Sequence, residues 1–199
     1  MSAPVAMPHR ERLLREGMRQ LFARGFHGTT VDAILEASGV PKGSFYHHFG
    51  SKEAFTREVL RRYMEFQLAL LERWSQDGET ATGALLSGYF GELADGFVRS
   101  DFRRACLAGK LSTEVAADYE VFRSQLSADM AAWKLGITKL LERGQARGDV
   151  RADRPATALA DAVLALVQGA FVVALASHDA TSLASVREAL ELLVTPPTR

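Results

Sequence analysis

The chain has 199 residues and carries 24 basic and 24 acidic side chains, so its formal net charge at pH 7 is zero. Hydrophobic residues make up 47% of it, which is enough for the core of one large domain or two small ones. A single cysteine excludes an internal disulfide framework and suits the reducing cytosol. Residues 1–8 have neither the charged nor the apolar region of a secretory signal peptide, so we expect a frayed tail there.

The spacing of apolar residues predicts helices along almost the whole chain. In the first helix, Leu14, Met18 and Leu21 share one side, and Gly25 supplies the C-terminal stop. No repeat, low-complexity segment or strand-like alternation interrupts the helical pattern. The expected helices span residues 9–24, 31–38, 41–47, 51–75, 80–99, 103–115, 119–147, 155–178 and 181–194. The sequence therefore predicts an all-α fold with about nine helices.

Residues 29–50 predict two short helices joined by a tight turn. Apolar residues recur at helical spacing after Thr30, and the hydroxyl of Thr30 or of Thr29 is placed to cap the helix that they form. Gly39 stands where the chain needs a positive φ, and Pro41 suits the first position of the second helix. This pattern is typical of a helix-turn-helix.

The second short helix has an unusual composition, because Phe45 is its one residue suited to a core. The residues left outside are Lys42, Gly43, Ser44, Tyr46 and His47. Cationic and hydroxyl groups contact phosphates and base edges, and a glycine lets the backbone approach closely. We therefore expect this face to lie in a DNA major groove, with Lys52 adding charge for a phosphate where the next helix starts.

The segment from Glu11 to Tyr63 resembles the DNA-binding domain of the TetR family of transcriptional repressors. The residues that carry the resemblance are, in order, Gly25-Phe26, Thr29-Thr30-Val31, Ile34, Ala37, Gly39-Val40, Lys42-Gly43, Phe45-Tyr46-His47-His48-Phe49 and Ser51-Lys52-Glu53. The resemblance implies double-stranded operator DNA as a partner. The DNA-contacting positions that it implies are Thr29, Thr30, Lys42, Ser44, Tyr46, His47 and Lys52. For Thr30, capping a helix and touching DNA remain equally open.

Charge is distributed unevenly along the chain. Residues 1–75 carry eleven Lys and Arg against eight Asp and Glu, whereas residues 76–199 carry thirteen against sixteen. Because this bias is weak, we expect modest non-specific DNA affinity and reliance on a dimer and a specific site. We divide the chain into a DNA-binding domain over residues 1–50 and a ligand-binding and dimerisation domain over residues 51–199, linked by helix 51–75.

Helix 155–178 is apolar nearly all round, and a buried helix is favoured over a membrane span because its most apolar run contains Gln168. One stripe comprises Leu159, Val163, Leu166, Ala170 and Val173, and the other Ala160, Leu164, Val167, Phe171 and Leu175. A small body buries one such stripe, so the second indicates another surface. With helix 181–194 this predicts a symmetric four-helix homodimer interface, which the TetR resemblance also implies. A monomer with a thick core is the alternative.

Cys106 is the one residue of the body with an obvious chemistry. Arg103 and Arg104 stand just before it, separated from it by Ala105, and Lys110 stands one helical turn later, where an ammonium would favour the thiolate. The short run that begins at Cys106 resembles a branch of TetR-like repressors that respond to electrophiles and oxidants through a cysteine. A buried cysteine that serves as a small hydrophobe is the alternative.

We expect a small-molecule effector to bind among the body helices. The candidate lining residues are Tyr89, Phe90, Phe102, Trp133, Gln168 and Phe171, although aromatic residues are more often simple core. No catalytic, cofactor-binding or metal-binding motif stands in the sequence, so no enzymatic activity is predicted. The predicted function is a cytoplasmic, homodimeric, ligand- or electrophile-responsive repressor of a palindromic operator. The alternatives are a ligand-independent architectural DNA-binding protein and a small all-α enzyme or carrier.

Overall fold

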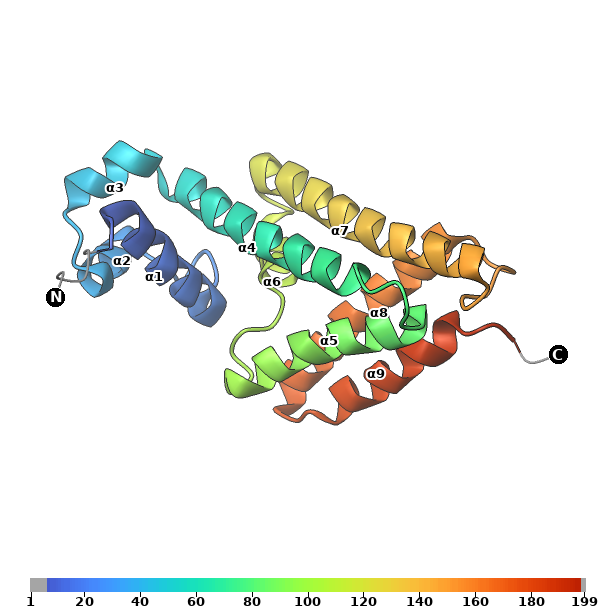
Figure 1. Ribbon diagram of the computed structural model, residues 1–199. Coiled ribbons are helices and arrows are strands. Elements are labelled where there is room, and N and C mark those ends of the chain that lie inside the picture. Colours follow the sequence, from blue (N-terminus) through green and yellow to red (C-terminus); the bar gives the residue numbers. More distant parts are fainter. Residues whose placement is uncertain (1–6, 198–199) are drawn as a thin grey trace, which may run out of the picture.

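The computed structural model describes residues 7–197, and these form nine α-helices (Figure 1). The helices are α1 (His9–Arg24), α2 (Val31–Ser38), α3 (Lys42–Phe49), α4 (Lys52–Ser75), α5 (Thr82–Arg99), α6 (Leu107–Val115), α7 (Glu120–Arg147), α8 (Ala156–Ser177) and α9 (Thr181–Val194). The predicted all-α fold is confirmed. Helix α6 begins at Leu107 instead of residue 103, and the expectation of a frayed tail falls mainly on residues 1–6, outside the described residues.

Helices α1, α2 and α3 form a small head at one end of the molecule (Figure 1). Thr30 caps α2 by accepting the Ala33 N–H at 3.2 Å, and Gly39 ends it in the left-handed conformation at φ 62°. The Arg12 guanidinium of α1 donates to the carbonyls of Ser38 and Gly39. The turn between α2 and α3 is therefore held by its glycine and by α1.

Helix α4 runs from the head into the body, where it lies along α7 (Figure 1). Ser51 caps α4 by accepting the Ala54 N–H at 3.1 Å. At its start, the fully buried Phe55 packs with Phe45 and Phe49 of the head, with ring centroids 5.1 and 4.8 Å away. At its other end, Leu71 is buried in the body. One continuous helix thus belongs to both cores.

Helix α8 has the length and composition of a membrane-crossing helix, with 22 residues and a mean hydropathy of 2.1 over its most apolar window. It packs against α7 and α9. Val163, Val167 and Phe171 of this helix are buried. Because they come from both predicted stripes, the division into one inner and one outer stripe is wrong.

The apolar residues that α8 exposes gather toward its C-terminal end. Val172, Val173 and Leu175 are 65%, 54% and 52% exposed, and Leu192 of α9 is 77% exposed. Because α9 runs back along α8 after a short turn, Leu192 lies toward the other end of this helix pair. An isolated exposed leucine is ordinary, but large aliphatic side chains exposed along two neighbouring helices are typical of a surface that another chain covers.

Candidate DNA-binding surface and effector cavities

Helix α3 presents most of its polar side chains to solvent. Lys42, Tyr46 and His47 are exposed, and Ser44 is half-buried, with its hydroxyl 3.3 Å from His9 Nδ1. A Cβ added at Gly43 would meet no atom within 4 Å, so the backbone there is open to a close approach. The exposed groups are of the kinds that contact DNA, and the buried Phe45 anchors the helix in the head core.

Lys42 lies close to an acidic neighbour in this surface. Its ammonium is 3.3 Å from Asp32 Oδ1, and both side chains are strongly exposed. An exposed pair of this kind is weak, so the ammonium remains available to an approaching phosphate.

Lys52 is placed differently, because its side chain is half-buried at the junction of head and body. The ammonium lies 4.3 Å from the centroid of the Phe26 ring. Burial lowers the pKa of Lys52, and the carboxylates of Glu53 and Glu114 partly offset that effect. A phosphate contact by Lys52 would therefore require its ammonium to leave the Phe26 ring.

Thr29 is not part of the exposed surface. Its side chain is 1% exposed, and its hydroxyl donates to the Gly25 carbonyl at 2.6 Å. The prediction that Thr29 contacts DNA through its side chain is wrong, because that side chain closes the corner between α1 and α2. Thr30, one residue later, is exposed and caps α2.

Helix α6 clamps this same corner from the body side. The Glu114 carboxylate accepts the backbone N–H groups of Phe26 at 2.9 Å and His27 at 2.7 Å. Gly25, at φ 70°, makes the approach feasible, since a Cβ there would overlap the carboxylate. One turn earlier on α6, Lys110 Nζ donates to the Phe22 carbonyl in the last turn of α1 at 2.7 Å. Head and body are thus joined by charge-assisted hydrogen bonds.

Cys106 is the N-cap of α6 and does not lie inside the helix. Its Sγ accepts the Gly109 N–H at 3.3 Å and lies 3.4 Å from Gln168 Nε2, and the residue is 6% exposed. Among the described residues, no hydrogen bond joins Lys110 to the thiol. The predicted Cys106–Lys110 pair is therefore wrong, because the Lys110 ammonium is engaged with the Phe22 carbonyl and burial lowers its pKa.

Two cavities meet at Cys106. One, of about 450 Å³, extends between α1, α4 and α5 and is lined by Tyr63, Trp133 and Phe171 among others. The other, of about 630 Å³, extends toward α8 and is lined by Phe102, Lys110, Gln168 and Phe171 among others. Burial, and then the neighbouring Cys106, raises the pKa of Tyr63, which keeps its hydroxyl neutral beside the thiol. Both cavities are mostly apolar with a few polar groups, as is usual for small-molecule sites.

The structure brings together Phe102, Trp133, Gln168 and Phe171 of the predicted lining around Cys106. Tyr89 and Phe90 do not line these two cavities and belong to the packed core. They border a separate void of about 10 Å³, and Tyr89 accepts a hydrogen bond from Trp133 Nε1 at 2.8 Å. The structure therefore separates them from the other predicted lining residues, because their side of α5 faces α7, α8 and α9.

Sequence reasoning missed the part of the lining that comes from the head and from α4. Phe22 of α1 lines both cavities, and Met18, Tyr63 and Gln67 line the smaller one. Phe22 lies on the apolar side of α1, next to Leu21, yet it is only half-buried there. The helical spacing of α1 places Phe22 at the edge of the apolar side, but it does not reveal that Phe22 contacts the body.

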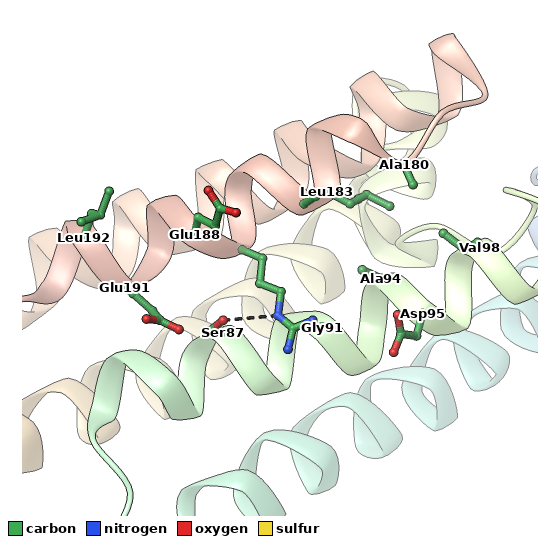
Figure 2. A pocket seen from close by; sticks show the side chains of 12 residues that line it. Ser87, Gly91, Ala94, Asp95, Val98, Ala180, Leu183, Glu188, Glu191 and Leu192 are labelled. Carbon is green, nitrogen blue, oxygen red and sulfur yellow. Dashed lines mark hydrogen bonds between the residues drawn. The ribbon is translucent and has the colours of Figure 1, made fainter.

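A further hollow of about 730 Å³ lies on the surface between α5 and α9 (Figure 2). Arg187 Nε is 3.4 Å from Ser87 Oγ there, while Glu188, Glu191 and Leu192 form the α9 side. This hollow adjoins the exposed Leu192 and contains none of the residues around Cys106. It is a feature of the surface between α5 and α9 and is separate from the cavities at Cys106.

Comparisons with known proteins identify both parts of this architecture. Residues 13–59 match the family described as bacterial regulatory proteins of the tetR family, and residues 84–190 match the tetracyclin repressor-like C-terminal domain. The chain belongs to the TetR family. Transcriptional regulator AcuR of Cereibacter sphaeroides is 36% identical over 160 residues, which cover 80% of this chain and 73% of AcuR. Within the TetR family, no enzymatic activity is expected, and the enzyme alternative is excluded.

Two solved TetR-family structures are similar over nearly the whole chain. The reduced form of NemR from Escherichia coli has a TM-score of 0.87 and 28% identity, covering 96% of this chain and 99% of NemR. A cysteine mutant of CifR, complexed with 26-bp double-strand operator DNA, has a TM-score of 0.79 and 26% identity, covering 96% and 98%. This chain is accordingly a helix-turn-helix regulator of the TetR family, and the CifR complex shows one of its relatives bound to operator DNA.

Proposed function

We propose that the protein is a homodimeric repressor of a palindromic operator, and that a small molecule bound beside Cys106 releases it from DNA. The observation that carries the proposal is the position of α6. Its first residue follows Cys106, where the two cavities meet, and Lys110 and Glu114 hold the head. A molecule that displaces α6 therefore acts directly on the orientation of the helix-turn-helix. We expect this to happen in the cytoplasm, where an operator is accessible.

The exposed apolar residues of α8 and α9 support the homodimer. Val172, Val173 and Leu192 lie on helices that would pair with their copies across a twofold axis to form a four-helix interface. A twofold dimer places its two α3 helices on half-sites about 34–36 Å apart, or a multiple of this distance. One head alone makes few DNA contacts, so operator affinity depends on this spacing.

Release from DNA requires two arrangements of the heads with different affinities for the effector. In the described arrangement, Phe26 connects the head to the body through more than the Glu114 clamp. Its ring lies 5.1 Å from that of Phe122 and 5.5 Å from that of Tyr119, at the start of α7. A shift of α6 against α7 would move this corner, and with it α2 and α3. We propose that the effector favours such a shifted arrangement.

Covalent modification of Cys106 is one form that the effector takes in this proposal. Addition of the thiol across an activated C=C bond forms a bond from Sγ to the β carbon and transfers the thiol proton to the α carbon. The adduct would fill a cavity and crowd Sγ, now a thioether, away from the Gly109 N–H, loosening the start of α6. Because Cys106 is 6% exposed, the electrophile must enter through the adjoining cavities.

Operator release by a maleimide, compared between the wild type and Cys106→Ser, tests the proposal. Serine retains an N-cap acceptor, so α6 should form in both proteins. Release of the wild type alone, with a single adduct per chain at Cys106 by mass spectrometry, is the expected outcome. Equal release, or release of neither protein, would contradict covalent sensing and favour a non-covalent effector in the same cavities.

Comparing an operator duplex with a random duplex at one salt concentration tests the architectural alternative. A specific repressor binds its operator on the order of 1,000-fold or more tighter than random DNA. An architectural protein binds both duplexes alike, because it reads the backbone and the deformability of DNA.

A further inference from the structure

The smaller cavity beside Cys106 combines an apolar interior with a cationic opening. Trp133 and Phe171 line the interior, whereas Arg99 and Arg104 lie at the side that continues into a second hollow. That second hollow, of about 580 Å³, lies between α1 and the C-terminal end of α5. The two hollows share both arginines and Phe22. We call Arg99 and Arg104 the arginine rim.

The other charged groups at this cavity already have partners. Arg62 Nη1 donates to Glu11 Oε2 at 2.6 Å, and the Glu92 carboxylate accepts from Arg73 at 2.6 Å and from Trp74 Nε1 at 2.8 Å. Arg19 and Arg103, which line the second hollow, pair with nearby acids in the same way.

Arg99 and Arg104 differ from these groups. Within residues 7–197, no carboxylate forms an ion pair with either of their guanidinium groups, although Glu92 lies within range of the Arg99 charge. The rim therefore carries two positive charges that no protein group directly compensates.

The loop after α5 fixes the second of these arginines. Ser100 Oγ accepts the backbone N–H groups of Arg103 at 3.2 Å and Arg104 at 2.9 Å. Phe102, at φ 55°, is held between the ring of Phe97 at 5.3 Å and that of His178 at 4.5 Å. A loop whose backbone is already constrained loses less backbone conformational entropy when one of its side chains binds a ligand.

We infer that the arginine rim binds the carboxylate or phosphate of an anionic amphipathic effector, whose apolar part occupies the cavity beside Cys106. Guanidinium groups present paired N–H donors that match these two anions, and an aromatic interior suits a hydrophobic tail. This inference rests on the proposed role of the cavity as the effector site, and it names the effector's chemical class. The anion would also lie against Phe22, whose carbonyl Lys110 holds.

Two fluorescent probes of similar shape test the rim without DNA. These are the anion 1-anilinonaphthalene-8-sulfonate and the neutral N-phenyl-1-naphthylamine. Replacing both arginines, as Arg99→Gln with Arg104→Gln, should weaken binding of the anion by about tenfold. Binding of the neutral probe should stay within about twofold, since its contacts are apolar. The matched control is Lys139→Gln with Arg154→Gln, which removes two exposed charges elsewhere and should change neither affinity.

An unchanged ratio of anion to neutral-probe affinity in the Arg99→Gln, Arg104→Gln variant would overturn the inference. Displacement of the anionic probe by decanoate or decyl phosphate, but not by decanol, would support the inference. The relative strength of the two anionic competitors would distinguish a preference for a carboxylate from a preference for a phosphate. Operator release is measured separately by fluorescence anisotropy of labelled DNA. Arginine-dependent probe binding without release would support the rim and contradict the regulatory role of the cavity.

Discussion

The head and the body are built from amphipathic helices of the same kind, but they collect their functional residues in different ways. The polar surface of α3 comes from one helix of eight residues and lies close in sequence to the helix that positions it. The cavities at Cys106 are assembled from α1, α4, α5, α6, α7 and α8. The proposed DNA surface is therefore a local property of the chain, whereas the proposed effector site exists only after the body has packed.

Disrupting the exposed surface of α8 and α9 should have the largest effect on operator binding, because without the proposed dimer the distance between two heads is no longer fixed. Val172→Glu combined with Leu192→Glu should give a monomer by light scattering and reduce operator affinity to that for random DNA, on the order of 1,000-fold. Val121→Glu, at an exposed position at the start of α7, is the control and should remain a dimer. A dimeric double variant with full operator affinity would exclude this surface as the interface.

Changes within α3 should weaken operator binding without altering the dimer. Lys42→Ala and Tyr46→Ala should each cost about 1–3 kcal/mol of operator affinity. Lys42→Ala should also reduce the salt dependence of binding, whereas a base-reading role of Tyr46 would leave that dependence nearly unchanged. Gel shifts at several salt concentrations measure both quantities. His48→Ala is the control, and wild-type affinity in all three variants would argue against the proposed contacts.

The neighbouring Thr29 and Thr30 separate packing from surface within the head itself. Thr29→Val removes a buried hydroxyl and leaves the Gly25 carbonyl without that donor, so it should lower the free energy of unfolding by about 1–3 kcal/mol. Thr30→Ala removes an exposed helix cap and should cost about 1 kcal/mol. Denaturant unfolding measures both changes. A larger loss for Thr30→Ala than for Thr29→Val would contradict this division of roles.

The same pair of residues shows what a sequence pattern reveals and what it leaves open. The positions of the helices followed from apolar spacing, from Gly39 and from the two serine and threonine caps, because these signals act over one or two turns. Which of two adjacent threonines faces inward depends on the path of the corner after Gly25, which short-range spacing does not determine.

Long-range contacts explain the remaining differences in the body. Lys110 was expected beside Cys106 because the two are four residues apart, but the nearest acceptor for its ammonium is a carbonyl of α1. Tyr89 and Phe90 were expected in the cavity because they are aromatic, but packing against α7, α8 and α9 gives them a core role. In each case, the deciding neighbour is remote in sequence.

The Glu114 clamp is where the two regions of this comparison meet, and weakening it should have the smallest effect on operator binding alone. Glu114→Gln preserves the shape of the side chain but replaces one acceptor oxygen with an N–H₂ group. That donor cannot accept from Phe26 or His27, so one of two charge-assisted hydrogen bonds is lost. We expect hydrogen exchange of these two amides to accelerate about fivefold, which corresponds to about 1 kcal/mol. Asp118→Asn, an exposed position beyond the end of α6, removes the same charge and should leave their exchange unchanged.

In the proposed mechanism, the looser clamp also transmits less of any α6 displacement, so maleimide-treated Glu114→Gln should retain more operator than the treated wild type. Slow exchange of both amides in Glu114→Gln would show that the corner is held by the packing of Phe26 against α7, and Glu114 would then have no part in coupling body to head.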